Sequence, residues 1–201
     1  MNNHTKGRNV QSQINLDNLP VNHHEKGRLF LSNDEIETLL KASKKSRYPT
    51  RNHLMLLMMY RHGLRVSELI NLRIKDVNLN RNRIWIKRLK NGLSVEHPIQ
   101  GDEQRAIKRY LRKRKDALPY LFVSERKEQL TRKTLNYIIK VASNKAGLVG
   151  VHPHTLRHSC GYYLANKGYD LRLIQDYLGH RDPKHTVLYT QIAGVRFEGL
   201  W

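Results

Sequence analysis

The chain has 201 residues, which allows one well-formed core. Lys and Arg number 37 against 17 Asp and Glu, and the formal net charge of +20 favours nucleic acid as a partner, with an anionic membrane surface as the rival. The longest apolar run, Leu54 to Tyr60, is far too short to span a bilayer, and the first thirty residues lack the apolar stretch of a signal peptide, so we expect a cytoplasmic protein. The single cysteine, Cys160, excludes an internal disulfide.

The first elements are predicted from helix start and stop signals. Residues 1–28 are polar and basic with few apolar positions, which predicts a flexible basic N-terminal arm. The segment 32–35 has the pattern of a capping box, so we expect a helix that runs to about Ser46. Residues 51–62 are apolar on most faces and are followed by Gly63, which predicts a buried helix at the centre of the core.

The middle of the chain has the pattern of a β-hairpin followed by a basic helix. Residues 83–86 and 94–99 are β-prone and flank Asn91-Gly92, a strong hairpin turn that places Lys90 at the tip. An amphipathic helix over 103–114 has a strongly basic outer face. Further predicted elements are a short strand over 120–124 and helices over 131–146, 154–167 and 170–178. The elements predict a single α+β unit that is predominantly α-helical, with a small antiparallel β-sheet.

A histidine and an arginine lie at the predicted start of the helix 154–167. Pro153 suits the first helical position, so His154 and Arg157 fall in the opening turns, three residues apart. Free N–H groups and partial positive charge at a helix start would make this pair part of a phosphate cradle. A solvated basic helix start is the simpler interpretation, and these residues alone leave both open.

The same segment has the spacing of a zinc site. His154 and His158 are four residues apart, and Cys160 lies close by. A zinc hydrolase helix would have Glu directly after the first His, where this chain has Thr155, and the sequence has no dense carboxylate cluster for a two-metal nuclease. We therefore expect no metal and no cofactor.

Phosphate chemistry without a metal needs further cations, because negative charge grows on the nonbridging oxygens and guanidinium groups match that geometry. Arg65 follows Gly63 at the start of a new predicted helix and has Glu68 one turn further on to orient it. By itself, an arginine that begins a surface helix usually has no catalytic role.

Tyr189 follows His180 by nine residues near the end of the chain. A tyrosine nucleophile forms a phosphodiester that stores the energy of a broken strand, which suits rearrangement of DNA rather than its degradation; a packing role is the alternative. Because a free tyrosine titrates near pH 10, it needs neighbouring cations and a base, for which His154 and His180 are candidates. Lys90 is the candidate donor of a proton to the departing hydroxyl.

In their order along the chain, these residues resemble the catalytic domain of the tyrosine site-specific recombinases and phage integrases. The resemblance covers roughly residues 30–201 and rests on the segments HGLRVSELINL, RLKNG, HPHTLRHSCG and LIQDYLGHRDPKHTVLYT. It implies the tyrosine recombinase catalytic-domain fold. The six positions that match the catalytic residues of this family are Arg65, Lys90, His154, Arg157, His180 and Tyr189.

The resemblance also implies what these positions do. The two arginines would clamp the scissile phosphate, and the two histidines would assist proton transfer and hydrogen-bond its oxygens. Lys90 would be the general acid, and Tyr189 would form a 3′-phosphotyrosyl link without a metal or a high-energy cofactor. Such enzymes exchange strands through a Holliday junction, so the expected partner is double-stranded DNA. The chain is expected to form a homotetramer on paired DNA sites. Accessory DNA-bending proteins are possible further partners.

The expected domain organisation departs from most relatives, which carry an additional N-terminal core-binding domain. Here we expect an arm over 1–28, a catalytic domain over 29–201 and no core-binding domain. Short relatives include the bacterial fimbrial phase-variation invertases, which HPHTLRHSCG and the ending RFEGLW resemble. Inversion of a DNA segment such as a fimbrial promoter switch is therefore expected. The alternatives are an integrase or excisionase of a mobile element, a non-catalytic DNA-binding regulator on the same scaffold, and a basic protein that coats nucleic acid.

Overall fold

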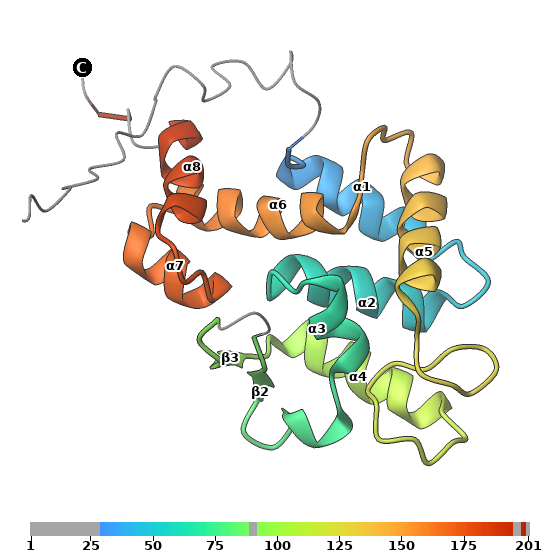
Figure 1. The fold of residues 1–201 in the computed structure, drawn as a ribbon. Helices are drawn as coiled ribbons and strands as arrows, with labels where there is room; N and C mark the ends of the chain where they lie inside the picture. Colours follow the sequence, from blue (N-terminus) through green and yellow to red (C-terminus); the bar gives the residue numbers. More distant parts are fainter. Residues whose placement is uncertain (1–28, 89–91, 195–197, 200–201) are drawn as a thin grey trace, which may run out of the picture.

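A computed structural model describes residues 29–88, 92–194 and 198–199. Within these ranges the chain is mostly helical with a small antiparallel sheet, and the predicted fold class is confirmed (Figure 1). The elements, in chain order, are α1 (Asn33–Ser43), α2 (Pro49–Arg61), α3 (Val66–Asn71), the 3₁₀ helix η2 (Ile74–Asp76), β1 (Val77–Asn78), β2 (Arg83–Ile86), β3 (Val95–Pro98), α4 (Gly101–Lys113), α5 (Arg132–Lys145), α6 (Pro153–Asn166), α7 (Leu171–Leu178) and α8 (Lys184–Ile192). The predicted arm over 1–28 lies outside the described residues.

Helix α2 is the centre of the core, as its all-round apolar sequence predicts. It packs against α1, α4 and α6, and its side chains from Leu54 to Met59 are almost entirely buried. Each such side chain contributes roughly 1.5–3 kcal/mol relative to an exposed one. The helix ends where Gly63 adopts a φ of +55°, a left-handed conformation that favours glycine. The C-terminal end of α2 is thereby fixed in the middle of the molecule.

Side-chain caps set the starts of several helices. The Ser32 hydroxyl accepts a hydrogen bond from the Glu35 N–H, and the Glu35 carboxylate accepts one from the Ser32 N–H, so the predicted capping box is confirmed. Thr131 and Asp170 cap α5 and α7 in a similar way. Helix α1 ends at Ser43, three residues earlier than predicted, because the following turns close with i→i−3 hydrogen bonds.

The sheet has the order β1-β2-β3 with antiparallel pairing throughout. In β2, Ile84 and Ile86 are buried while Arg83 and Trp85 are exposed, so one face of the strand covers the core. The two predicted hairpin strands are confirmed, with Ile86 opposite Val95. The turn that joins them includes residues 89–91, which lie outside the described part of the chain.

One sequence-based expectation about the elements is wrong, and one helix was missed. The predicted strand over 120–124 is an irregular segment, in which Tyr120 and Val123 make only isolated bridges, to Arg73 and Gln129. Helix α8 was not predicted: its N-cap residue is Pro183, which has no capping side chain, and its sequence includes β-branched residues that lower helix propensity. Packing against α6 and α7 stabilises it instead.

Helix α6 crosses the middle of the molecule, with α7 and α8 at one end and α1 and α5 at the other (Figure 1). A second, smaller apolar cluster joins α6, α7 and α8. Its buried members are Cys160, Ala165, Ile174, Leu178, Tyr189 and Ala193. None of the helices in the described residues is long and apolar enough to cross a membrane.

Candidate active site

Arg65 and Glu68 form a local pair at the start of α3. The Glu68 carboxylate accepts a hydrogen bond from the Arg65 N–H at 2.9 Å and another from Nη1 at 2.7 Å. The Glu68 side chain is 1% exposed, whereas that of Arg65 is 23% exposed. The predicted orienting contact is therefore present, and it leaves part of the Arg65 guanidinium open to an incoming anion.

Arg157 reaches the same carboxylate from α6. Its Nη1 lies 3.9 Å from Glu68 Oε2, so the two arginines that sequence reasoning paired do meet at one acid. Arg157 is 4% exposed, and its guanidinium donates to the carbonyls of Gly63 and Leu178. Burial, followed by the neighbouring positive charges of Arg88 and Arg65, lowers the pKa of Arg157 to about 10, so it stays cationic at neutral pH.

Arg88, which sequence reasoning missed, is the third arginine on this carboxylate. It lies just after β2, and its fully buried side chain places Nη1 2.8 Å from Glu68 Oε2. Its Nη2 donates to the carbonyls of His62 at 3.0 Å and Tyr177 at 2.6 Å, which tie the ends of α2 and α7 together. The only sequence signal was an arginine two residues before Lys90.

Three guanidinium groups therefore surround one carboxylate. Burial acts to raise the pKa of Glu68, but Arg88, the Arg65 N–H and Arg157 lower it overall, so this acid is ionised. One negative charge among three positive ones leaves a formal excess of two positive charges. Such a cluster matches the charge of a phosphate that is undergoing transfer.

Tyr189 lies against α6 and is 1% exposed. Its hydroxyl is 2.8 Å from Nδ1 of His158, and its ring rests where a Cβ atom at Gly161 would come within 2.6 Å of it. Burial raises the pKa of Tyr189 to about 12, against the opposing effects of Arg157 and Arg65. Tyr189, the candidate nucleophile, thus lies near Arg157, the candidate phosphate-binding residue, and its hydroxyl is protonated at neutral pH.

His180 also lies beside Tyr189. It follows the left-handed Gly179 at the end of α7, and its ring stacks on Tyr189 with 6.3 Å between the centroids. Its Nδ1 is 2.8 Å from the hydroxyl of Thr186 on α8. Burial, with Arg157 nearby, lowers the pKa of His180 to about 3, so the ring is neutral.

His154 lies at the exposed start of α6. It is exposed in the first turn of α6, whereas Arg157, three residues on, is buried. The helix start is capped by His152, whose Nδ1 accepts from the Thr155 N–H at 3.3 Å. The sequence named His154 and His180 as candidate bases for Tyr189, and these assignments stay predictions. In the described residues the His158 Nδ1 lies 2.8 Å from the Tyr189 hydroxyl, a contact that the sequence did not predict.

Comparison with known proteins assigns the family. Residues 29–194 match the phage integrase family. The chain belongs to that family. It is 44% identical over 180 residues to the type 1 fimbriae regulatory protein FimE of Escherichia coli K12, with 87% of this chain and 91% of FimE covered. By family and fold it is a tyrosine-type site-specific DNA recombinase.

Solved structures of recombinases have the same fold. The crystal structure of the XerA recombinase superposes with a TM-score of 0.73 at 31% identity, covering 81% of this chain and 60% of that one. The XerH site-specific recombinase bound to its palindromic difH substrate superposes with a TM-score of 0.75 at 27% identity, covering 85% and 52%. This recombinase therefore spans only about half to three-fifths of the length of those two proteins.

Two further expectations concern the reaction of this recombinase. The candidate general acid Lys90 lies outside the described residues. Among the described residues, no group of three or more His, Cys, Asp or Glu side chains could hold a metal ion. Cys160 is buried and donates its S–H to the carbonyl of Arg61 at 3.5 Å, and burial raises its pKa to about 12, so it acts as a packing residue between helices.

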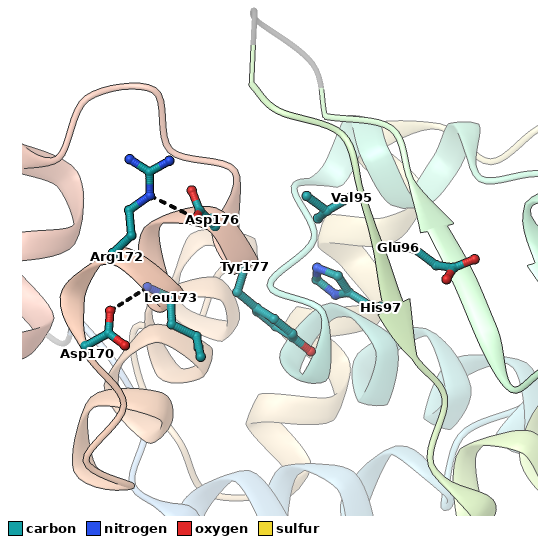
Figure 2. Close-up of a pocket in the computed structure, with 8 residues that line it drawn as sticks. All are labelled: Val95, Glu96, His97, Asp170, Arg172, Leu173, Asp176 and Tyr177. Atoms are coloured by element: carbon teal, nitrogen blue, oxygen red, sulfur yellow. Dashed lines mark hydrogen bonds and ion pairs between the residues drawn. The ribbon is translucent and has the colours of Figure 1, made fainter.

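A cavity of about 470 Å³ lies between β3 and α7 of the recombinase (Figure 2). His97 stacks on Tyr177 in its wall with 3.8 Å between the ring centroids. Asp170 and Asp176 line the α7 side of it together with Arg172, which pairs with Asp176 at 2.9 Å, while the Glu96 side chain points away from the cavity (Figure 2). The excess of negative charge makes this cavity unsuitable for a DNA phosphate, so the arginine cluster is the better candidate.

Proposed function

We propose that this recombinase cleaves and rejoins DNA through a 3′-phosphotyrosyl bond to Tyr189 and thereby inverts a DNA segment. The observation that carries the proposal is the convergence of Arg65 and Arg157 on Glu68, beside the buried Tyr189. Arginine forks with a net positive charge suit the phosphate, and the adjacent phenol suits covalent attack. This is the chemistry that the family resemblance implies for these positions.

The proposed reaction needs only groups of the protein. Arg65 and Arg157 bind the nonbridging oxygens while the Tyr189 oxygen attacks phosphorus and the 5′ oxygen leaves with a proton from Lys90. His180 stabilises the same oxygens by hydrogen bonds from its neutral ring, and the exposed His154 approaches the phosphate from the start of α6. Rejoining is the reverse reaction with a DNA 5′-hydroxyl as the nucleophile.

DNA binding has to rearrange the site before it can react. Arg157 donates to two backbone carbonyls, and Tyr189 is buried with its hydroxyl on His158. Binding of the phosphate by Arg157 requires its guanidinium to exchange these carbonyls for phosphate oxygens. We expect this exchange and the release of Tyr189 to occur together, because Arg157 belongs to α6 and Tyr189 packs against that helix.

Inversion is favoured by the similarity to FimE. That relative is named a type 1 fimbriae regulatory protein and is covered over 91% of its length. The net charge of +20 suits double-stranded DNA, and XerH, a structural neighbour, has been solved with its DNA substrate. We further propose a homotetramer on two paired sites in the bacterial cytoplasm, with accessory DNA-bending proteins biasing the direction.

The test is covalent capture. Duplexes that bind the Tyr189→Phe variant are selected from random sequence, rebuilt with a nick as a suicide substrate, and incubated with the wild-type chain. A denaturant-resistant protein–DNA adduct that Tyr189→Phe does not form is expected. DNA binding without an adduct would instead support the non-catalytic regulator.

A second measurement addresses the direction of recombination. A plasmid carries two selected sites in inverted orientation around a promoter, and a second plasmid carries them in direct orientation. Inversion of the first plasmid with little excision from the second is expected. Excision alone would support the integrase or excisionase alternative.

A further inference from the structure

The Tyr189 hydroxyl has to lose a proton when it attacks phosphorus. Its burial makes spontaneous ionisation rare at neutral pH, so a nearby acceptor is needed. A general base must lie within hydrogen-bond distance of the proton that it takes. In the described residues, His158 Nδ1 lies at that distance from the hydroxyl, at 2.8 Å.

The geometry of α6 favours His158 over the other histidines. Gly161 lies one turn after the adjacent residues Arg157 and His158, so the candidate phosphate-binding arginine, the histidine ring and the glycine that faces the Tyr189 ring share one side of the helix. The Nδ1 of His180 is engaged with Thr186, and His154 is exposed one turn before His158. Arg157 lies near enough to act electrostatically on the Tyr189 hydroxyl that His158 contacts.

We propose that His158 is the catalytic base that accepts the proton of Tyr189. This inference rests on the proposed function. In cleavage, the Tyr189 O–H bond breaks as the bond from its oxygen to phosphorus forms, and the proton moves to Nδ1 of His158. The bond from phosphorus to the 5′ oxygen breaks, and that oxygen takes its proton from the general acid. In rejoining, His158 returns the proton to the tyrosine oxygen.

The surroundings of His158 keep its ring neutral, so that one ring nitrogen is unprotonated and available as an acceptor. The ring is partly buried, and the groups that face it are His152, His154 and Arg157 from α6 and its cap, and His185 and Tyr189 from α8. Burial, then His154 and Arg157, lowers its pKa to about 4. The neutral tautomer with its proton on Nε2 presents the Nδ1 lone pair to the tyrosine hydroxyl. The negative charge of a bound phosphate would raise the basicity of this nitrogen.

Two substitutions separate acceptance of a proton from mere anchoring. His158→Asn places an amide oxygen near the position of Nδ1, so it can still hold the Tyr189 hydroxyl but cannot take its proton. His158→Ala removes both functions and leaves space for free imidazole. His53→Asn is the matched control, because His53 is a half-buried histidine on α2 that bonds to the carbonyl of Leu40 at 3.1 Å, remote from the site.

The measurement is the single-turnover rate of adduct formation on the selected suicide substrate between pH 5.5 and 9. We expect both His158 variants to react about 10²–10⁴-fold more slowly than the wild type, as loss of a general base predicts. The wild-type rate should depend weakly on pH, because the base is already neutral. The variant rates should rise about tenfold per pH unit, because hydroxide must then take the proton. Added imidazole should accelerate His158→Ala and not His158→Asn.

Several outcomes would overturn the role of His158. Wild-type rate and pH profile in His158→Asn would make the histidine an anchor only. A His158→Ala variant faster than the wild type would make it a restraint on Tyr189. A slow variant without imidazole rescue and with an unchanged pH profile would indicate a structural defect. Failure of the wild-type chain itself to form an adduct would reject the proposed function rather than this assignment.

Discussion

The carboxylate of Glu68 and the guanidinium of Arg88 lie 2.8 Å apart with both side chains almost completely buried, although one belongs to α3 and the other follows β2. Through this contact the sheet is joined to the acid that orients Arg65. Arg88 also binds the carbonyls at the ends of α2 and α7. The candidate site is thus assembled around a pair that contains neither the nucleophile nor the two arginines expected from the sequence.

Replacement of Arg88 by Met should destabilise the fold and abolish cleavage. Removal of Arg88 takes a buried ion-pair partner from Glu68 and a donor from the carbonyls of His62 and Tyr177, and loss of such a partner costs about 3–5 kcal/mol. The free energy of unfolding in urea and the yield of adduct measure the two effects. The double variant Glu68→Gln/Arg88→Met should be less stable still and should not cleave, since Arg65 and Arg157 then lack the carboxylate that they share. Equal stability of the single and double variants would contradict the pairing.

Replacement of Gly161 by Ala should displace Tyr189. The added methyl group would lie 2.6–2.7 Å from three ring atoms, a distance that the packed ring can relieve only by moving. Overpacking of this kind costs about 1–3 kcal/mol, and we expect adduct formation to fall while DNA binding persists. Gly101→Ala is the control, since its methyl group would meet only the flexible end of Arg105 at 3.4 Å. A crystal structure or an adduct assay that showed Tyr189 unaffected would refute this packing argument.

Stability should fall as the pH drops below about 6.5. Burial lowers the pKa of His180 to about 3 and holds the pKa of His97 far below its usual value, so the folded chain keeps both rings neutral while the unfolded chain protonates them. Each such ring removes about 1.4 kcal/mol of stability per pH unit in this window. Urea unfolding at pH 7.5 and 5.0 measures the loss.

The variant His97→Phe tests the origin of this pH dependence. Phenylalanine preserves an aromatic ring against Tyr177 but has no titrating group, so the dependence of stability on pH should become shallower. An unchanged slope would mean that His97 does not contribute. Glu68 contributes a second loss of stability at lower pH. Its pKa is lowered in the folded chain, so its contribution to stability is lost only as the pH falls below the ordinary pKa of a carboxyl group.

Chelation of metals should leave cleavage unchanged. The proposed transition state is stabilised by arginines, and the described residues contain no group of three or more metal-ligating side chains. Adduct formation in the presence of EDTA should match that in added magnesium. A reaction that stopped with EDTA and resumed with a divalent ion would restore the metal hypothesis.

Local contacts were predictable from the sequence. The capping box at Ser32 and the contact between Arg65 and Glu68 join residues three positions apart, where helix geometry dictates proximity. The stop at Gly63 follows from the conformational freedom of glycine. These local rules predicted most of the helices and the orientation of Arg65, one of the two candidate phosphate-binding arginines.

Contacts between distant segments were not predictable in this way. His158 and Tyr189 are 31 residues apart, and their contact depends on α8, a helix without a side-chain cap. Arg88 reaches the carbonyl of Tyr177 across 89 residues, and nothing in the local sequence distinguishes it from the many surface arginines. The base candidate and the third arginine therefore became visible only in the folded chain.

A protein with a charge of +20 will meet every phosphodiester of a chromosome on its way to a target. Under the proposed reaction, such encounters do not break a strand as long as the two groups proposed to act on the phosphate are occupied inside the protein. Arg157 is held by the carbonyls of Gly63 and Leu178, and Tyr189 is held by His158. If Tyr189 and Arg157 act as proposed, the burial that makes the tyrosine a poor nucleophile in isolation also protects non-target DNA from random nicks while the protein searches.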